Sequence, residues 1–305
     1  MSTDPSKTKI WIKAARLRTL PLAFASIILG SMIAAFYGSY QISAIVLALL
    51  TTLFLQVLSN FANDYGDTVN GADHKDREGP SRAVQTGLIS LTQMRNAMIL
   101  FSVLSFVSGL MLIHISFPFL ETSYFVFVLL LLLCVYASIT YTSGKNPYGY
   151  MALGDISVFL FFGVFGVALN AYLHLNNWYW MILLPAAAIG LLSAGVLNLN
   201  NMRDVISDKQ AGKNTIAIIL GFQKSKNYHY ALVILPFILV TVFVVSEIKD
   251  LSIFNFIYFI CLPIVIKQII TIQNIKYVQH YDPLLKTLAL TTLLFCITTG
   301  LSLLL

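Results

Sequence analysis

Long apolar runs alternate with short polar segments along the whole chain. Nine runs are long enough to cross a bilayer, because a helical span needs about 20 mostly apolar residues. They cover residues 20–37, 44–62, 96–115, 122–141, 151–173, 179–199, 229–246, 252–272 and 285–304. The pattern predicts an all-α polytopic membrane protein, a bundle of about nine transmembrane helices formed by a single domain over residues 1–305.

Composition and charge agree with this pattern. Hydrophobic residues make up 58% of the chain and charged residues 10%, whereas soluble proteins carry about 25% charged residues. Of the 19 lysines and arginines, only Lys249 falls on one side of the predicted bundle. Because basic residues favour cytoplasmic loops, we expect the N-terminus and the basic loops in the cytoplasm. This bias explains the net charge of +6 without a nucleic-acid partner.

Two short acidic stretches follow the second and the sixth apolar runs, on the side of the basic loops. The first holds Asn63, Asp64 and Asp67, directly after the apolar run. At a helix end, acids at i and i+3 share one face. Ionisable groups at the membrane boundary are costly and are candidates for function. The next loop carries three acids that fit a solvated cap of the span, namely Asp73, Asp76 and Glu78.

The second acidic stretch mixes acids with cations. Asp204 and Asp208 are at i and i+4 on an expected helical continuation of the sixth span, with Arg203 and Lys213 nearby. Carboxylates alone would repel a diphosphate, whereas Mg²⁺ accepts oxygen ligands and shares them with phosphates. The mixture therefore indicates a Mg²⁺-bridged diphosphate whose remaining oxygens are bound by the cations. A helix end with charge pairs is the alternative.

Two further segments on this side hold candidate residues. Tyr141 could stabilise a developing carbocation by its ring face, while Lys145 binds the leaving phosphate; an interfacial tyrosine with a snorkelling lysine is the alternative. Residues 5–19 predict an interfacial helix that leads into the first span. In that helix, Arg16 either anchors the chain at the interface or faces a phosphate.

These residues resemble the UbiA superfamily of intramembrane aromatic prenyltransferases, over almost the whole chain. The matching motifs are Asn63-Asp64-x-x-Asp67, Tyr141-x-x-x-Lys145 and Asn201-x-Arg203-Asp204-x-x-x-Asp208-x-x-x-Gly212-Lys213-x-Thr215. Within this family, the chain looks most like the 1,4-dihydroxy-2-naphthoate polyprenyltransferases of menaquinone synthesis. That likeness is carried by Asn63-Asp64-Tyr65-Gly66-Asp67, running on to Gly79-Pro80-Ser81-Arg82-Ala83-Val84-Gln85-x-Gly87.

The chain departs from the family pattern at two positions. The wider family often has a third acid four residues after the second, where this chain has Gly71. The naphthoate enzymes share that change, so it favours the naphthoate group. The N-terminal motif usually has proline where this chain has Leu17, and this difference weakens the transfer of a family residue's role to Arg16.

The resemblance implies a reaction, its residues and a location in a bacterial inner membrane. Mg²⁺ on a polyprenyl diphosphate would be held by Asn63, Asp64, Asp67, Asp204 and Asp208. The diphosphate oxygens would be bound by Lys145, Arg203, Lys213, Arg82, Asn201 and Arg16. The chemical step would depend most on Tyr141, Lys145, Asp67 and Asp208. Attack by 1,4-dihydroxy-2-naphthoate on an allylic cation, with loss of CO₂, would give demethylmenaquinone, while the prenyl tail lies among the helices and membrane lipid.

Two other functions fit part of the sequence. The first keeps the enzyme class with another acceptor, such as 4-hydroxybenzoate, homogentisate, chlorophyllide or haem. The second is an ion-coupled secondary transporter, but transporters place coupling acids near the bilayer midplane, and no apolar run here has an acid at its centre. A non-catalytic lipid-binding scaffold leaves the two aspartate pairs unexplained.

Overall fold

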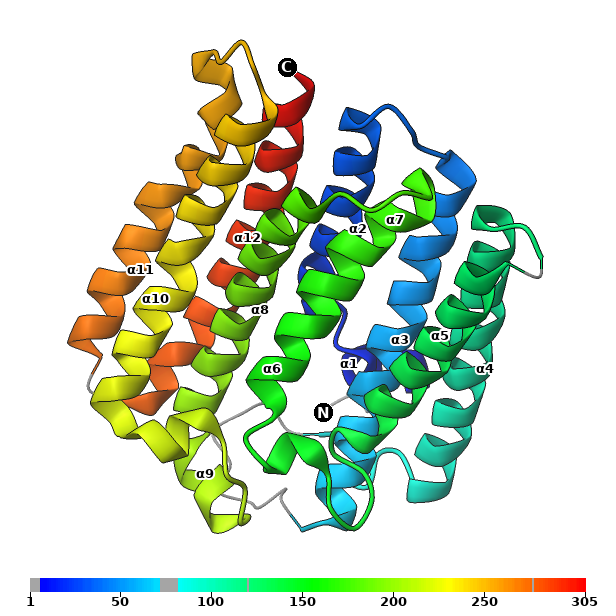
Figure 1. Cartoon of the computed structure of the whole chain (residues 1–305). Coiled ribbons are helices and arrows are strands. Elements are labelled where there is room, and N and C mark those ends of the chain that lie inside the picture. Colours follow the sequence, from blue (N-terminus) through cyan, green and yellow to red (C-terminus); the bar gives the residue numbers. More distant parts are fainter. Residues whose placement is uncertain (1–5, 72–81, 120, 276) are drawn as a thin grey trace.

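The computed structural model describes residues 6–71, 82–119, 121–275 and 277–305, and helices stand side by side through this part of the chain (Figure 1). Within these ranges, eight helices are long and apolar enough to cross a membrane, or nine if the bent pair α1 and α2 forms one span. This confirms the predicted all-α membrane fold. The loop acids Asp73, Asp76 and Glu78 lie outside the described residues, as does the segment Gly79-Pro80-Ser81.

The helices of the N-terminal half are α1 (Lys7–Ala15), η1 (Leu17–Thr19), α2 (Leu20–Phe36), α3 (Ile42–Val69), α4 (Leu91–Ser116) and α5 (Thr122–Thr140). A link with η2 (Tyr148–Tyr150) leads to one span made of α6 (Gly154–Val158), η3 (Phe159–Leu169) and α7 (Asn170–Leu175). The remaining helices are η4 (Trp180–Ile182), α8 (Leu183–Arg203), α9 (Val205–Gln210), α10 (Ile216–Glu247), η5 (Ile253–Cys261), α11 (Leu262–Asn274), η6 (Val278–Tyr281) and α12 (Asp282–Leu304).

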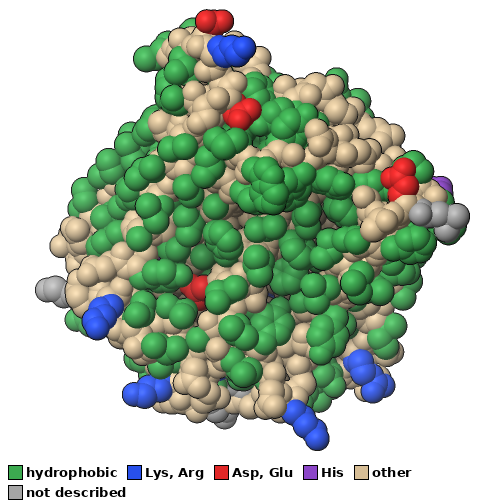
Figure 2. Space-filling model, in the orientation of Figure 1, with side chains coloured by type: hydrophobic (Ala, Val, Ile, Leu, Met, Phe, Trp, Pro, Cys, Tyr) green, Lys and Arg blue, Asp and Glu red, His purple; other side chains and the backbone are tan. Residues whose placement is uncertain are grey.

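Apolar packing divides the bundle into two parts. The larger core joins α2, η3, α8, α10 and α12, and includes the fully buried Leu29, Ile189 and Val233. Separate clusters hold α3 against α4 and α5, around residues such as Leu58 and Met94. Many outer side chains are large, apolar and exposed, and Figure 2 shows a mostly hydrophobic face with basic side chains along its lower rim. Such a surface suits lipid contact around the middle of the bundle.

Three helix ends differ from the predicted ones. Helix α3 continues past residue 62 to Val69, so the first acidic stretch is helical. The N-terminal helix ends at Ala15, because Arg16 adopts a left-handed conformation (φ 50°), and α1 and α2 meet at 53°. The expected helical continuation of the sixth span is interrupted: α8 ends before Asp204 (φ −91°, ψ 10°), and Asp208 lies on α9 with its backbone N–H donating to the Asp204 carbonyl at 2.8 Å.

The segments with candidate residues gather at one end of the bundle. In Figure 1, the C-terminal end of α3, the link between α5 and α6, and α9 all lie at the lower end, and α1 lies above them in the lower half. The N-terminus of α12 also reaches this end, because Asp282 contacts Arg203. The alternation of spans thus brings both acidic stretches to the same end of the bundle, as predicted.

Candidate active site

A cavity of about 630 Å³ lies between the two parts of the bundle and extends from this lower end into the apolar interior. Its interior is lined by apolar side chains that include Leu112, Phe127, Phe161, Phe165 and Leu173. Its polar end is lined by Arg16, Asn63, Asp67, Arg82, Asn200, Asn201, Arg203, Asp204, Asp208, Lys213 and Asp282. The cavity therefore joins a charged mouth to a long apolar chamber.

Asp67 is a centre of the polar end. Its buried carboxylate lies 2.5 Å from Nη2 of Arg82 and 3.3 Å from Nζ of Lys213. The hydroxyl of Tyr150 donates a third interaction to the same carboxylate. Burial raises the pKa of Tyr150, so the phenol stays protonated and can donate. Two cations and a phenol thus stabilise one buried negative charge.

Lys213 connects the two acidic stretches. Its Nζ lies 3.3 Å from a carboxylate oxygen of Asp67 on α3 and 3.3 Å from one of Asp208 on α9. The same ammonium lies 4.7 Å from the centre of the Tyr150 ring. Burial raises the pKa of Asp208, and the Lys213 charge opposes this effect. One cation therefore occupies a position from which it reaches carboxylates of both stretches.

Arg203 organises the second stretch. Its Nε and Nη2 donate to the two oxygens of the Asp204 carboxylate, each at 2.8 Å. Its Nη1 lies 2.5 Å from Asp282 at the start of α12, and Nη2 also donates to Asn200 at 2.8 Å. This bidentate pairing holds α8, the following turn and α12 together at the mouth.

Asp64 plays a different part from its neighbour Asp67. It is 2% exposed and is absent from the cavity lining. Its carboxylate lies 3.2 Å from Arg16 and 3.7 Å from Arg82, and it accepts the backbone N–H of Ala83 at 3.2 Å. Asp64 therefore fixes two arginines of the cavity wall from behind, and Arg16 is an ion-pair partner as well as a wall residue.

The link after α5 positions the first stretch. Thr142 donates its hydroxyl to Oδ1 of Asn63 at 2.9 Å, and Asn70 donates to the Thr142 carbonyl at 2.9 Å. The approach is close at Gly66, where a Cβ atom would lie 2.4 Å from the Thr142 carbonyl oxygen. Only glycine lets this link pack so tightly on α3. The Asn63 side chain is thereby held in place at the cavity wall.

The predicted pair Tyr141 and Lys145 is separated by the structure. Tyr141 lines the cavity, and burial raises the pKa of its phenol, which stays neutral. Lys145 is exposed and is absent from the lining. Helix α5 ends at Thr140 and Gly144 adopts a φ of 106°, so the spacing of one helical turn does not apply here.

The structure thus gathers most of the predicted residues around one cavity. Two are placed off its wall, Asp64 behind it and Lys145 at the surface. Sequence reasoning missed Thr142, Tyr150 and Asp282. A signal was available for Tyr150, which is one of two tyrosines that follow Pro147 in a polar link. Within the described ranges, no group of three histidine, cysteine or acidic side chains is close enough to hold a metal ion by itself.

Comparisons with known proteins agree on one family. The sequence profile of the UbiA prenyltransferase family matches residues 23–277. The chain is 41% identical over 300 residues to a 1,4-dihydroxy-2-naphthoate octaprenyltransferase of Haemophilus influenzae, covering 98% of this chain and 96% of that protein. It is also 41% identical over 263 residues to the Escherichia coli protein of the same name, covering 86% and 84%.

A solved structure supports the fold. The structure of a UbiA homologue from Archaeoglobus fulgidus, bound to GPP and Mg²⁺, matches with a TM-score of 0.61 and 18% identity. The match covers 95% of this chain and 100% of the homologue. The resemblance seen in the motifs is confirmed, and the chain belongs to the UbiA prenyltransferase family.

Proposed function

We propose that the protein transfers a polyprenyl group from polyprenyl diphosphate to 1,4-dihydroxy-2-naphthoate. The bond between the prenyl C1 atom and the diphosphate oxygen breaks, a carbon–carbon bond to the ring forms, and the carboxylate leaves as CO₂. The product is the reduced form of demethylmenaquinone. Two relatives that are 41% identical carry the name of this activity.

One observation carries the chemical part of the proposal. Lys213 contacts carboxylates of both acidic stretches at 3.3 Å, at the charged mouth of a chamber that is mostly apolar. A prenyl diphosphate has the same division into a highly charged head and an apolar tail. The charged mouth therefore matches the diphosphate head, and the apolar chamber behind it matches the prenyl tail.

Mg²⁺ is the cofactor that fits the polar end. The wall offers the hard oxygen donors that Mg²⁺ prefers, from Asn63, Asp67, Asp204 and Asp208. The ammonium of Lys213 shows that one cation can reach Asp67 and Asp208 together. When bound, Mg²⁺ would neutralise the diphosphate and favour its departure. We assign Asp64 a supporting role, because it faces Arg16 and Arg82 rather than the cavity.

The cations of the wall bind the diphosphate oxygens in this proposal. Lys213 and Arg82 contact Asp67, and Arg203 contacts Asp204, so substrate binding exchanges carboxylate partners for phosphate oxygens. Arg16 and Asn201 line the same mouth and complete the set. Such charge-assisted hydrogen bonds strengthen as negative charge develops on the leaving group.

Tyr141 and the apolar chamber act on the other half of the reaction. The neutral phenol of Tyr141 lines the cavity, and its ring face can stabilise positive charge on the prenyl carbon. The apolar walls exclude water, which would otherwise capture the cation. Lys145 takes no part in this proposal, because its side chain lies at the surface.

We propose that the charged mouth faces the cytoplasm of a bacterium, since the basic residues lie on this side. The test uses Lys145→Cys and Lys249→Cys, which lie in links at opposite ends of the bundle. A membrane-impermeant thiol reagent added to intact spheroplasts should label position 249 and spare position 145. The reverse labelling would overturn this orientation.

The activity is tested with purified protein, Mg²⁺, radiolabelled octaprenyl diphosphate and a panel of aromatic acids. We expect turnover of 1,4-dihydroxy-2-naphthoate with one CO₂ released per prenyl group transferred, and loss of turnover with EDTA. Prenylation of 4-hydroxybenzoate in place of the naphthoate would overturn the acceptor assignment. Turnover that persists without divalent cations would overturn the role of Mg²⁺.

A further inference from the structure

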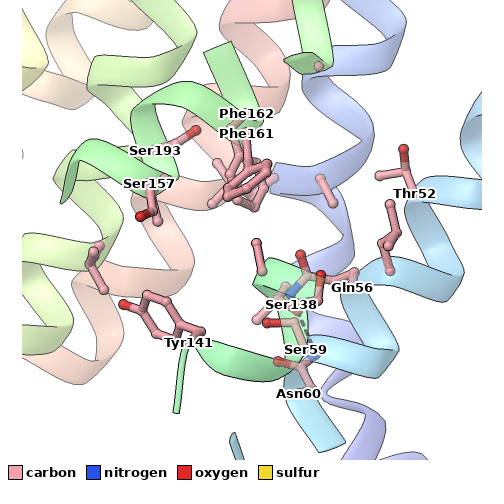
Figure 3. Close-up of a pocket in the computed structure, with 18 of the residues that line it drawn as sticks. Thr52, Gln56, Ser59, Asn60, Ser138, Tyr141, Ser157, Phe161, Phe162 and Ser193 are labelled. Carbon is pink, nitrogen blue, oxygen red and sulfur yellow. Dashed lines mark hydrogen bonds between the residues drawn. The ribbon is translucent and has the colours of Figure 1, made fainter. Parts of the chain in front are cut away.

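Polar side chains continue along the cavity wall beyond the charged mouth. On α3, Gln56, Ser59, Asn60 and Asn63 all line the cavity, at spacings of three and four residues that place them on one helix face. Figure 3 shows Gln56 and Ser59 on this wall, and Ser138 of α5 lines the same cavity. Ser157 and Ser193 also line the mostly apolar chamber, but this row stands out because four polar side chains share one helix face.

Two amides of this row differ in how they are used. Asn60 donates to the Ala15 carbonyl at 2.9 Å and to Thr19 Oγ1 at 3.3 Å, so it fastens α3 to the N-terminal segment. The side chains of Gln56 and Ser59 make no hydrogen bond to any residue of the described ranges. Asn60 therefore has a structural role, whereas Gln56 presents an unused amide to the cavity.

An unused amide at this depth needs an explanation. Gln56 is half-buried, so water can reach its amide from the cavity. A ligand that displaces this water without replacing its hydrogen bond would incur a cost of roughly 2–7 kcal/mol. Leucine or methionine would fill the same space without that cost. The amide is therefore expected to find its partner in a ligand of the cavity.

The position of Gln56 identifies which part of the ligands it meets. It lies seven residues before Asn63 on α3, about 10 Å along the helix axis, beyond reach of a diphosphate bound at the mouth. A polyprenyl tail has no hydrogen-bonding group, and Phe161 and Phe162 of η3 supply an apolar wall for it (Figure 3). The remaining polar groups among the substrates are the hydroxyls and the carboxylate of the aromatic acceptor.

We propose that Gln56, with Ser59 and Ser138, forms the subsite that binds the polar substituents of the aromatic acceptor and selects it. The amide of Gln56 donates to an acceptor oxygen. The hydroxyl of Ser138 donates to the Cys134 carbonyl at 2.8 Å, which leaves its oxygen lone pairs to accept from a ring hydroxyl. The acceptor thus lies against α3 and α5 and the prenyl tail against η3. This inference rests on the proposed prenyl transfer.

The test compares Gln56→Leu with wild-type protein in steady-state kinetics for each substrate. We expect the KM for 1,4-dihydroxy-2-naphthoate to rise about tenfold, equivalent to about 1.4 kcal/mol, while the KM for octaprenyl diphosphate stays within about twofold. Gln56→Glu is the second variant; its carboxylate repels that of the acceptor and should raise the acceptor KM further. Gln93→Leu, the same substitution at an exposed position of α4 outside the cavity lining, is the matched control and should change neither KM.

The outcomes separate this inference from the proposed function. An acceptor KM within twofold of wild type in both Gln56 variants would overturn the subsite, and so would a rise confined to the prenyl diphosphate KM. If wild-type protein prenylates a different aromatic acid, the same kinetics with that acid still test Gln56. Mg²⁺-dependent binding of octaprenyl diphosphate by each variant shows that it is folded.

Discussion

At the residue scale, the site is a set of buried charges that neutralise one another. Asp67 is shared by Arg82 and Lys213, and Lys213 is shared by Asp67 and Asp208. A buried carboxylate without such partners would be strongly unfavourable. In the proposed reaction, the same cations would bind the diphosphate once a metal ion is held by the carboxylates. The pairing thus stabilises the buried charges and offers groups for the proposed substrate.

Lys213 and Lys145 provide a direct comparison of two lysines. We expect Lys213→Ala to lower kcat/KM for the prenyl diphosphate about a hundredfold, because it loses a charged hydrogen bond worth about 3 kcal/mol. Lys145→Ala should stay within about twofold of wild type, since that side chain is exposed. Steady-state assays of both variants check this expectation. A severe loss of activity in Lys145→Ala but not in Lys213→Ala would support the role in phosphate binding that the sequence predicted for Lys145.

The sequence identified the acids and bases but only part of their arrangement. Asp67, Asp208 and Lys213 could be singled out because charged residues are rare beside apolar runs. Tyr150 and Thr142 could not, because each contacts α3 from a segment about 80 residues away. Helical periodicity reports which residues share a face, and it carries no information on such tertiary contacts.

At the element scale, the link between α5 and α6 determines where α3 presents its acids. Thr142 holds Asn63, and Tyr150 holds Asp67. Asn214 beyond α9 also donates its backbone N–H to the Tyr150 carbonyl at 2.9 Å. One irregular segment therefore touches both acidic stretches and fixes their separation.

Gly66 tests the importance of this packing. A methyl group at this position would lie 2.4 Å from the Thr142 carbonyl oxygen, so Gly66→Ala should push the link away from α3. We expect a loss of stability of about 1–3 kcal/mol, with a larger relative loss of activity. Gly195→Ala on α8 is the control, because its methyl group would lie 3.4 Å from Leu288 in ordinary contact. Thermal unfolding and turnover in detergent measure both effects, and equal behaviour of the two variants would argue against a positioning role for the link.

At the scale of the whole molecule, the proposed site forms where two halves that are distant in sequence meet. The apolar runs predicted the bundle because spans alternate in direction and return both acidic stretches to one end. The breaks at Arg16 and Asp204 were not predicted; at each break the side chain pairs with a charged partner, Asp64 or Arg203. The cavity itself follows from packing between helices, which a hydropathy pattern does not specify.

The most direct test of a shared site is a double-mutant cycle in Mg²⁺-dependent prenyl transfer, using Asp67→Asn, Asp208→Asn and the double variant. If one metal–diphosphate site spans both stretches, each single variant should lose several kcal/mol of transition-state stabilisation, about a thousandfold in rate. The double variant should then be hardly slower than either single variant, because residues that act as a unit are not additive. Full activity in both single variants, or independent losses that multiply in the double variant, would contradict a single site built from both halves.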